Sequence, residues 1–228
     1  MTYIEILANF EREINKIDDA VNKPATDDSL FWLNQAVAKF VKLRFNGDLV
    51  HKTSYEQNDK RRMDLIHLFI ETPLAVGAVK HHRSYDEYEV HYPNNFMYSL
   101  NEDVVIDSKS GGHPIDTCVF ECTADSFMYR VNNSLTDFHY KYHRARPLRI
   151  RFDHGCKLLT DKNYVIKSYT LGYLRQPEEI TLKRPHEEYT DFEEIVMYEI
   201  IKMAAQMYIE NQKDERYRTI TNEVLTQE

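Results

Sequence analysis

Residues 163–211 read NYVIKSYTLGYLRQPEEITLKRPHEEYTDFEEIVMYEIIKMAAQMYIEN and join a strand pattern to the most helix-like pattern in the chain. Side chains of a strand alternate between its two faces. In the strand at 163–174, one face would carry Tyr164, Ile166, Ser168, Thr170 and Gly172, and the other Val165, Lys167, Tyr169, Leu171 and Tyr173. Neither face is purely polar, so we expect this strand to be covered on both sides.

The second part of this segment predicts a long amphipathic helix within 186–212. Thr190 and Glu193 have the spacing of a capping box, in which two side chains satisfy free backbone N–H groups at a helix start. An apolar stripe at helical spacing follows: Phe192, Ile195, Val196, Ile200, Met203, Ala204 and Met207. A helix with such a stripe needs a surface to cover it. We expect the N-terminal helices and the sheet to supply that surface.

Two helices are predicted in the N-terminal region, residues 1–48. Thr2 and Glu5 form another capping-box pair ahead of the first apolar stripe. Asp27 or Asp28 can cap the second helix. Because the connection between them is short, the two helices should form an antiparallel hairpin.

The central region, residues 49–185, has the alternating pattern of short strands. We identify ten candidate strands, which include SFMYRV at 126–131 and DFHYKYH at 137–143. Short strands with tight turns pair in antiparallel sheets. The sequence therefore predicts an α+β fold, with the N-terminal helical hairpin and the C-terminal amphipathic helix packed together against a central antiparallel β-sandwich or barrel. The polar residues 213–228 should form an extended tail or interaction arm.

The composition is that of a folded protein in a reducing compartment. Hydrophobic residues make up 42% of the 228 residues, which argues against disorder. The chain has three cysteines and no charged-then-apolar leader at Met1. No apolar run approaches the roughly 20 residues of a membrane helix. We expect a soluble protein that is intracellular or part of something assembled inside a cell.

The net charge of −8 is concentrated at one end of the chain. Residues 186–228 contain eleven acidic residues against four basic ones, whereas the first 185 residues contain 26 against 25. Proteins that bind nucleic acid without sequence preference are expected to be basic, because their affinity comes from neutralising phosphates. The charge balance argues against that class.

The sequence contains no motif of a known catalytic or cofactor site. It lacks a glycine-rich phosphate loop, a Gly-x-Ser-x-Gly elbow, a His-Glu-x-x-His pair and a Cys-x-x-Cys pair. We therefore expect no enzyme activity, no cofactor and no metal ion.

Cysteine and histidine offer one possible zinc set, made of Cys118, Cys122, His154 and Cys156. A spacing of four along a strand would hold the first two Cα atoms about 13 Å apart, too far for two thiolates to share one ion. We interpret the cysteines as free thiols. The carboxylates at 187–194 are better explained as negative charge at a helix N-terminus, which the helix dipole favours.

Basic and aromatic residues alternate in HYKYHRARPLRIR, residues 139–151. Its cations are Lys141, Arg144, Arg146, Arg149 and Arg151. One interpretation is a nucleic-acid strip, in which rings stack on bases between phosphate contacts. Another is an exposed edge strand whose charges, together with Pro147, prevent unwanted pairing. A third is a contact with the acidic C-terminal segment of an adjacent copy.

Several short motifs follow one another through the last third of the chain. They are Pro147-Leu148-Arg149-Ile150, Leu158-Leu159-Thr160-Asp161, Tyr164-Val165-Ile166, Tyr173-Leu174-Arg175-Gln176-Pro177 with Ile180, Glu194-Ile195-Val196, Ala204-Ala205, Tyr208-Ile209 and Asp214-Arg216-Tyr217. In this order they resemble the C-terminal segment of virion structural proteins of crAss-like and related short-tailed bacteriophages. That segment closes a head-to-tail connector subunit, similar to tail tubular protein A and other adaptor or ring proteins beneath the portal. FWLNQA at 31–36 fits the same pattern.

The resemblance implies a structural protein without catalytic activity, located in the phage neck or tail and assembled in the host cytoplasm. Its partners would be further copies in a ring around the DNA channel, expected to be dodecameric, together with the portal and neighbouring ring or tail proteins. DNA would be only cargo passing through the channel, and no membrane would be involved. Candidate residues for contacts between copies are Arg144, Arg146, Arg149, Arg151, Arg216, Tyr217, Ile220, Val224 and Leu225. The alternative function is a nucleic-acid-binding accessory protein that uses the strip at 139–151.

Overall fold

The computed structural model describes residues 1–17, 24–46 and 59–211 and contains two compact units. The helical unit combines residues 1–68 with the segment that follows Gln176, and the β unit spans Phe69–Gln176. The β unit is thus inserted between two parts of the helical unit, and it is shorter than the region 49–185 expected from the sequence. The helices and the two sheets confirm the α+β class.

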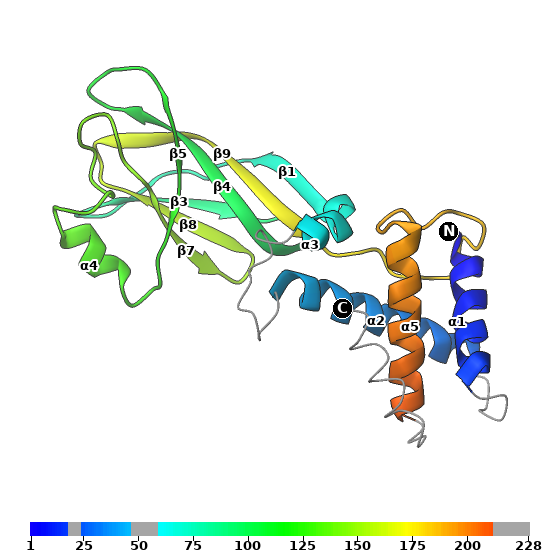
Figure 1. The fold of residues 1–228 in the computed structure, drawn as a ribbon. Coiled ribbons are helices and arrows are strands. Elements are labelled where there is room, and N and C mark those ends of the chain that lie inside the picture. The colour runs from blue at the N-terminus through cyan, green and yellow to red at the C-terminus, as the bar shows by residue number, and fades with distance from the viewer. Residues whose placement is uncertain (18–23, 47–58, 212–228) are drawn as a thin grey trace. The chain divides into compact units, whose positions relative to one another are not determined.

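The helical unit is built from α1 (Tyr3–Ile17), α2 (Thr26–Asn46) and α5 (Glu194–Asn211), with the short α3 (Asp59–Asp64) and a 3-10 turn, η2 (Ile66–Leu68). Figure 1 shows α1 and α5 side by side, with α2 crossing them. The C-terminal helix packs on both N-terminal helices, as the sequence predicts. Edge-on ring contacts join Phe10 to Tyr208, Trp32 to Tyr208, and Phe40 to Phe192.

The start of α1 has the predicted capping box, and the start of α5 does not. Glu5 accepts a hydrogen bond from the Thr2 backbone N–H at 2.8 Å, and Thr2 Oγ1 accepts one from the Glu5 N–H at 3.4 Å, which confirms the capping box. The capping box predicted at Thr190 and Glu193 is wrong. Because α5 begins only at Glu194, the Glu193 carbonyl accepts the first helical hydrogen bond and Thr190 lies outside the helix start.

The buried face of α5 differs from the predicted stripe. Its buried residues are Val196, Met197, Ile200, Ile201, Ala204, Ala205, Tyr208 and Ile209. Ile195, which the stripe included, is 80% exposed, and Met203 and Met207 are only half-buried. The reason is that α5 packs against both α1 and α2, so its covered face is wider than one stripe and is centred elsewhere.

The β unit is a sandwich of two sheets. The four-stranded sheet has the order β1 (Phe69–Leu74), β9 (Tyr164–Arg175), β4 (Phe96–Ser108) and β5 (Ile115–Cys118). The five-stranded sheet has the order β2 (Lys80–His81), β3 (Asp86–His91), β8 (Gly155–Thr160), β7 (Leu148–Phe152) and β6 (Phe120–Glu121). Neighbouring strands are antiparallel except β6 and β7, which are parallel.

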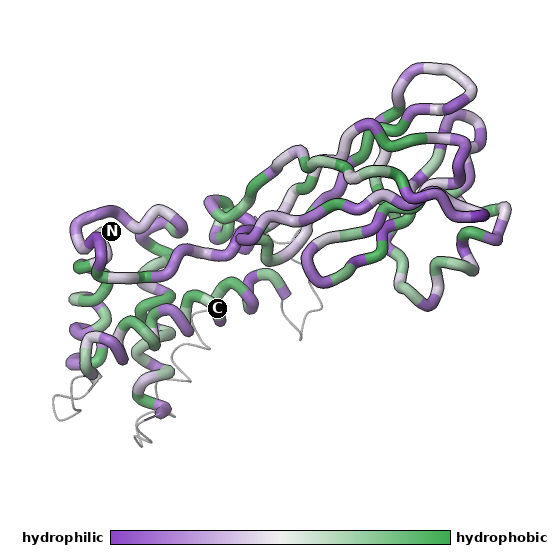
Figure 2. Tube along the Cα trace, turned by 180° about the vertical axis from the view of Figure 1, so that it is seen from behind, coloured by the Kyte–Doolittle hydropathy of each residue, from purple (hydrophilic) through white to green (hydrophobic). Residues whose placement is uncertain are grey.

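Side chains from both sheets meet in one apolar core. Its buried members are Tyr88, Val90, Val104, Ile106, Ala145, Cys156, Leu158, Tyr164, Ile166, Tyr169, Leu171 and Tyr173. The opposite face of the five-stranded sheet is covered by α4 (Phe127–Asn132), whose Val131 packs in a second core with Phe138, Leu148 and Leu159. Figure 2 shows hydrophobic and hydrophilic positions interspersed along the strands. This pattern is expected where one face of a strand is buried and the other is exposed, because successive side chains point to opposite faces.

A bulge breaks the simple alternation expected along β9. Its pairing with β4 shifts after Ile166, so that Lys167 is an extra residue on β9. The bulge brings Tyr164 and Ile166 onto the same core face as the residues beyond it: Tyr169, Leu171 and Tyr173. The predicted face that joined Ile166 to Ser168 is therefore wrong. Both faces of the strand are buried only at residues 171–174.

Two of the predicted strands are not strands. Of the predicted strand at 126–131, residues 127–131 lie in α4, because Phe127 and Val131 are four residues apart and share the helix face that packs on the second core. Residues 137–143 belong to the loop between α4 and β7. The interpretation of 139–151 as an edge strand is also wrong, since β7 lies between β8 and β6.

Candidate functional site

A groove of about 520 Å³ lies beside the loop that links α4 to β7. We call it the basic groove. It is lined by the cations Lys141, Arg144 and Arg146, the histidines His139 and His143, and the acids Asp116 and Asp137, together with neutral residues. The first part of the predicted basic strip therefore lies along one groove, which β5 borders. The second part of the strip is in β7 and has different surroundings.

A tight hairpin, residues 141–144, forms the tip of this loop, and we call it the Tyr142 hairpin. The backbones of Lys141 and Arg144 exchange both N–H···O hydrogen bonds, at 3.0 and 2.9 Å, across the turn Tyr142-His143. Both turn residues have positive φ, 48° and 59°, as a type I′ turn requires. A non-glycine residue in this conformation costs about 1–3 kcal/mol. The Tyr142 side chain is 93% exposed, so the strained turn holds an aromatic ring in solvent.

The base of the hairpin is fixed to the sandwich. The Asp161 carboxylate accepts a hydrogen bond from the Tyr140 N–H at 2.8 Å, and the Tyr164 hydroxyl donates to the Phe138 carbonyl at 3.1 Å. Phe138 and Ala145, which flank the hairpin, are buried in the two cores. The exposed tip is therefore held by a base that is part of the folded β unit.

The positive charge of the basic groove is only partly compensated. Lys141 Nζ donates to the Ser134 carbonyl, and Arg146 lies 4.0 Å from Asp137. Neither Lys141 nor Arg144 has an ion pair with another residue that the structure describes. Exposed ion pairs contribute little in water, so the weak Arg146 pair leaves that cation available as well. The hairpin thus presents cations around an exposed ring.

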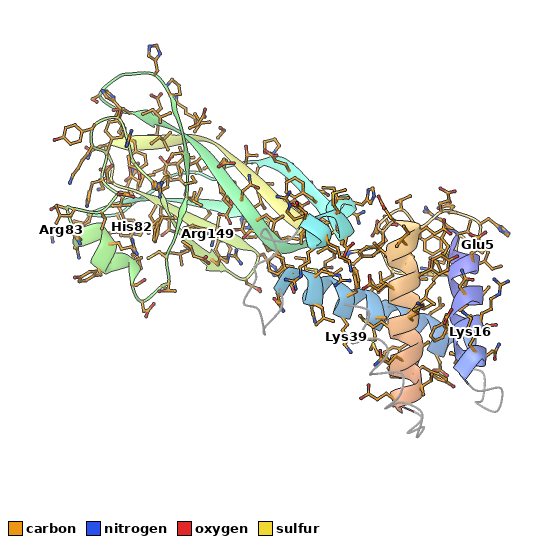
Figure 3. The ribbon with its side chains drawn as sticks, in the orientation of Figure 1. Glu5, Lys16, Lys39, His82, Arg83 and Arg149 are labelled. Atoms are coloured by element: carbon orange, nitrogen blue, oxygen red, sulfur yellow. The ribbon has the colours of Figure 1, made fainter. Side chains whose placement is uncertain are left out.

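Arg149, which we expected at a contact between copies, is instead buried inside the β unit. Its guanidinium pairs with the buried Glu102 carboxylate and lies 2.6 Å from Glu121. Burial opposes the charge, but the two carboxylates outweigh it and raise the pKa of Arg149. Figure 3 labels Arg149 on β7. This arginine is therefore a structural residue of the sandwich and not an exposed contact residue.

Arg151, two residues further along β7, is half exposed. It donates a hydrogen bond to Ser99 Oγ and lies 3.9 Å from Glu121. The remaining predicted contact residues lie outside the described residues, as does the expected tail at 213–228: Arg216, Tyr217, Ile220, Val224 and Leu225. Of the nine candidates, Arg144 and Arg146 are the two that line the basic groove.

The three cysteines lie in separate environments. Cys118 is exposed on β5, Cys122 is buried in the second core and Cys156 is buried in the sandwich core. The chain crosses from one sheet to the other between Cys118 and Cys122, so these residues do not share a strand as the sequence suggested. Burial raises the pKa of the Cys156 thiol to about 11.

A thiol reagent at neutral pH should modify Cys118 alone in the folded protein. Cys122 and Cys156 are buried, and the raised pKa of Cys156 leaves almost no reactive thiolate at that residue. Peptide mass spectrometry after a short reaction should find one modified cysteine, and all three after denaturation. Modification of Cys156 as fast as Cys118 in the native protein would contradict the buried core.

Within the described residues, no group of three or more His, Cys, Asp or Glu side chains could hold a metal ion. Across residues 1–17, 24–46 and 59–211, no helix combines the length and the apolar character of a membrane span. Comparison with known protein families gives no matching family, and comparison with curated proteins gives no similar sequence.

Proposed function

We propose that this protein is a structural subunit that assembles with copies of itself into a ring of a phage head-to-tail connector. The observation that carries the proposal is the separation of opposite surface charges. The β unit bears the exposed cationic hairpin, and the helical unit bears exposed carboxylates at the start of α5 and in the segment ahead of it, namely Glu187, Glu188, Glu193 and Glu194. Complementary charged surfaces on one chain attract between copies and fix their orientation.

Contacts of this kind suit a ring. A surface on one unit that binds a different surface on the next copy is a head-to-tail contact, and such contacts close into rings when the rotation between copies permits. The motif order of the last third of the chain supports the assignment to a connector beneath the portal. In a connector the subunit would have a structural role as part of the ring wall, and DNA would pass through the channel as cargo.

Exposed apolar side chains on the helical unit are consistent with protein partners. Ile195 and Tyr198 are neighbours on the outer face of α5, three residues apart, and Ile4 of α1 is also exposed. Apolar and aromatic side chains that are exposed in one copy become favourable when a partner covers them. We propose that these residues lie in contacts with further copies or with neighbouring ring proteins.

The second candidate function is a nucleic-acid-binding accessory protein. The basic groove favours it, because an exposed ring with nearby cations can stack on a base between phosphate contacts. Asp116 and Asp137 line the same groove and would repel phosphates, and the net charge of −8 opposes general binding. We therefore place this candidate second.

A salt titration of DNA binding separates the two functions. For the structural subunit we expect weak binding to duplex and single-stranded DNA at physiological salt, with little change when Arg144 and Arg146 are replaced by glutamine. Fluorescence anisotropy with labelled oligonucleotides measures the affinity of the wild type and of the double variant for each form of DNA. Tight binding that falls steeply with salt and is lost in the double variant would favour the nucleic-acid function, because each phosphate contact contributes to the salt slope.

A further inference from the structure

We propose that the Tyr142 hairpin of one copy docks into an acidic groove on the helical unit of the next copy. This inference rests on the proposed function and names the contact that would join copies in the ring. The two surfaces belong to different units of the chain.

The receiving surface is a groove of about 460 Å³ between α1 and the first turns of α5, with Glu188 from the segment ahead of α5. We call it the acidic groove. Glu5, Glu188 and Glu194 line it, and the opposing charges are Arg12 and the α-amino group of Met1, which lies near Glu5. Figure 3 labels Glu5 at the start of α1. Three carboxylates thus face two cations, so the groove keeps a net negative charge that attracts a positively charged partner.

The acidic groove also offers apolar contact. Tyr198 lines it and is 42% exposed, and Ala8 and the Met1 side chain lie in the same lining. A tyrosine ring that enters such a groove can bury its faces while its hydroxyl remains hydrogen-bonded. The groove therefore suits a ring that arrives with cations on both sides.

The Tyr142 hairpin has that composition. Tyr142 projects at its tip, and Lys141 and Arg144 flank it without an ion pair among the described residues. Tyrosine and arginine are enriched among the residues that dominate binding energy at protein interfaces. Because the anchored base already orders the loop, docking would require little further ordering, which favours affinity.

Another acidic groove, on the four-stranded sheet, is a poorer receiver. Glu71, Asp103 and Asp116 line it, without an aromatic side chain. Asp116 also lines the basic groove itself, so this surface adjoins the hairpin within its own unit. A nucleic acid is likewise disfavoured as the occupant, because Asp116 and Asp137 stand beside the cations.

The test uses a variant that keeps the turn and removes the ring. Asn-Gly is the preferred dipeptide for a type I′ turn, so the double substitution Tyr142→Asn with His143→Gly should preserve or raise the melting temperature. Self-association, measured by sedimentation of the full chain, should weaken about 30-fold if Tyr142 is a dominant contact. Tyr129→Asn is the matched control, because Tyr129 is 78% exposed on α4 and lies outside the Tyr142 hairpin.

A charge exchange tests the identity of the receiver. Arg144→Glu and Glu194→Lys should each weaken self-association, and the two together should recover much of it, because the attraction is restored with the signs reversed. Unchanged self-association in the Asn-Gly variant, or no recovery in the charge exchange, would overturn the docking. If the wild-type protein still assembles in that case, the proposed function stands. A wild type that does not assemble would overturn both.

Discussion

Replacing Ile200 with aspartate should unfold the helical unit, whereas the same change at Ile195 should leave its stability nearly unaltered. Ile200 is 0% exposed on the face of α5 that packs against α1 and α2, and Ile195 is 80% exposed. The Ile200 variant combines a lost apolar contact with a buried charge, for which we expect a loss of about 5 kcal/mol or more. Thermal unfolding followed by circular dichroism measures the difference.

The two variants control each other, because they introduce the same residue into the same helix. Both lose a β-branched side chain and gain one negative charge near the acidic start of α5. Equal destabilisation would mean that the charge itself, and not burial, decides the effect. A stable Ile200→Asp variant would show that α5 packs through another face.

Replacing Arg149 with methionine should destabilise the β unit by about 3–5 kcal/mol, because the buried Glu102 carboxylate would lose its partner. The double variant Arg149→Met with Glu102→Leu should regain most of that loss, since an apolar pair of similar volume can replace a buried ion pair. Chemical unfolding of the wild type, both single variants and the double variant gives the coupling between the two residues.

Arg151→Met is the matched control for Arg149, because Arg151 lies on the same strand and is half exposed. Its contact with Glu121 is at 3.9 Å, and loss of an exposed pair should change stability by less than about 1 kcal/mol. If Arg149→Met were as mild as Arg151→Met, the buried pair with Glu102 would not exist in solution.

The α+β class and the packing of α5 on the N-terminal helices could be predicted from the sequence, because both depend on apolar periodicity over long segments. The capping box at Thr2 and Glu5 was also predictable, since its hydrogen bonds are local. The face of α5 was not. The prediction of a single apolar stripe assumes that one neighbouring element covers the helix. Because α5 packs against both α1 and α2, the exposure of Ile195 depends on tertiary packing.

The β unit was harder to predict, because the features that differ from the predicted pattern depend on pairing and packing partners that are distant in sequence. The extra residue Lys167 in β9 is defined only by pairing with β4. The helix at 127–132 is stabilised by the second core, which residues from other elements build. Local patterns do not contain that information.

The candidate site was predicted in part. The alternation of rings and cations at 139–151 identified the region that lines the basic groove, but charge alone could not distinguish Arg144, which is exposed, from Arg149, which is buried beside Glu102. The hairpin was missed because Tyr142-His143 is not a typical turn dipeptide. The acidic groove was missed because Glu5 and Glu194 are far apart in sequence.

Native mass measurement of the purified protein, alone and with the portal and ring proteins that we propose as its neighbours, tests the proposal of a self-assembling ring most directly. We expect one closed species whose mass is an integer multiple of the 27.2 kDa chain, with a dodecamer as the expected state and an open channel in electron micrographs. A protein that stays monomeric at every concentration, both alone and with those neighbours, would contradict the proposal.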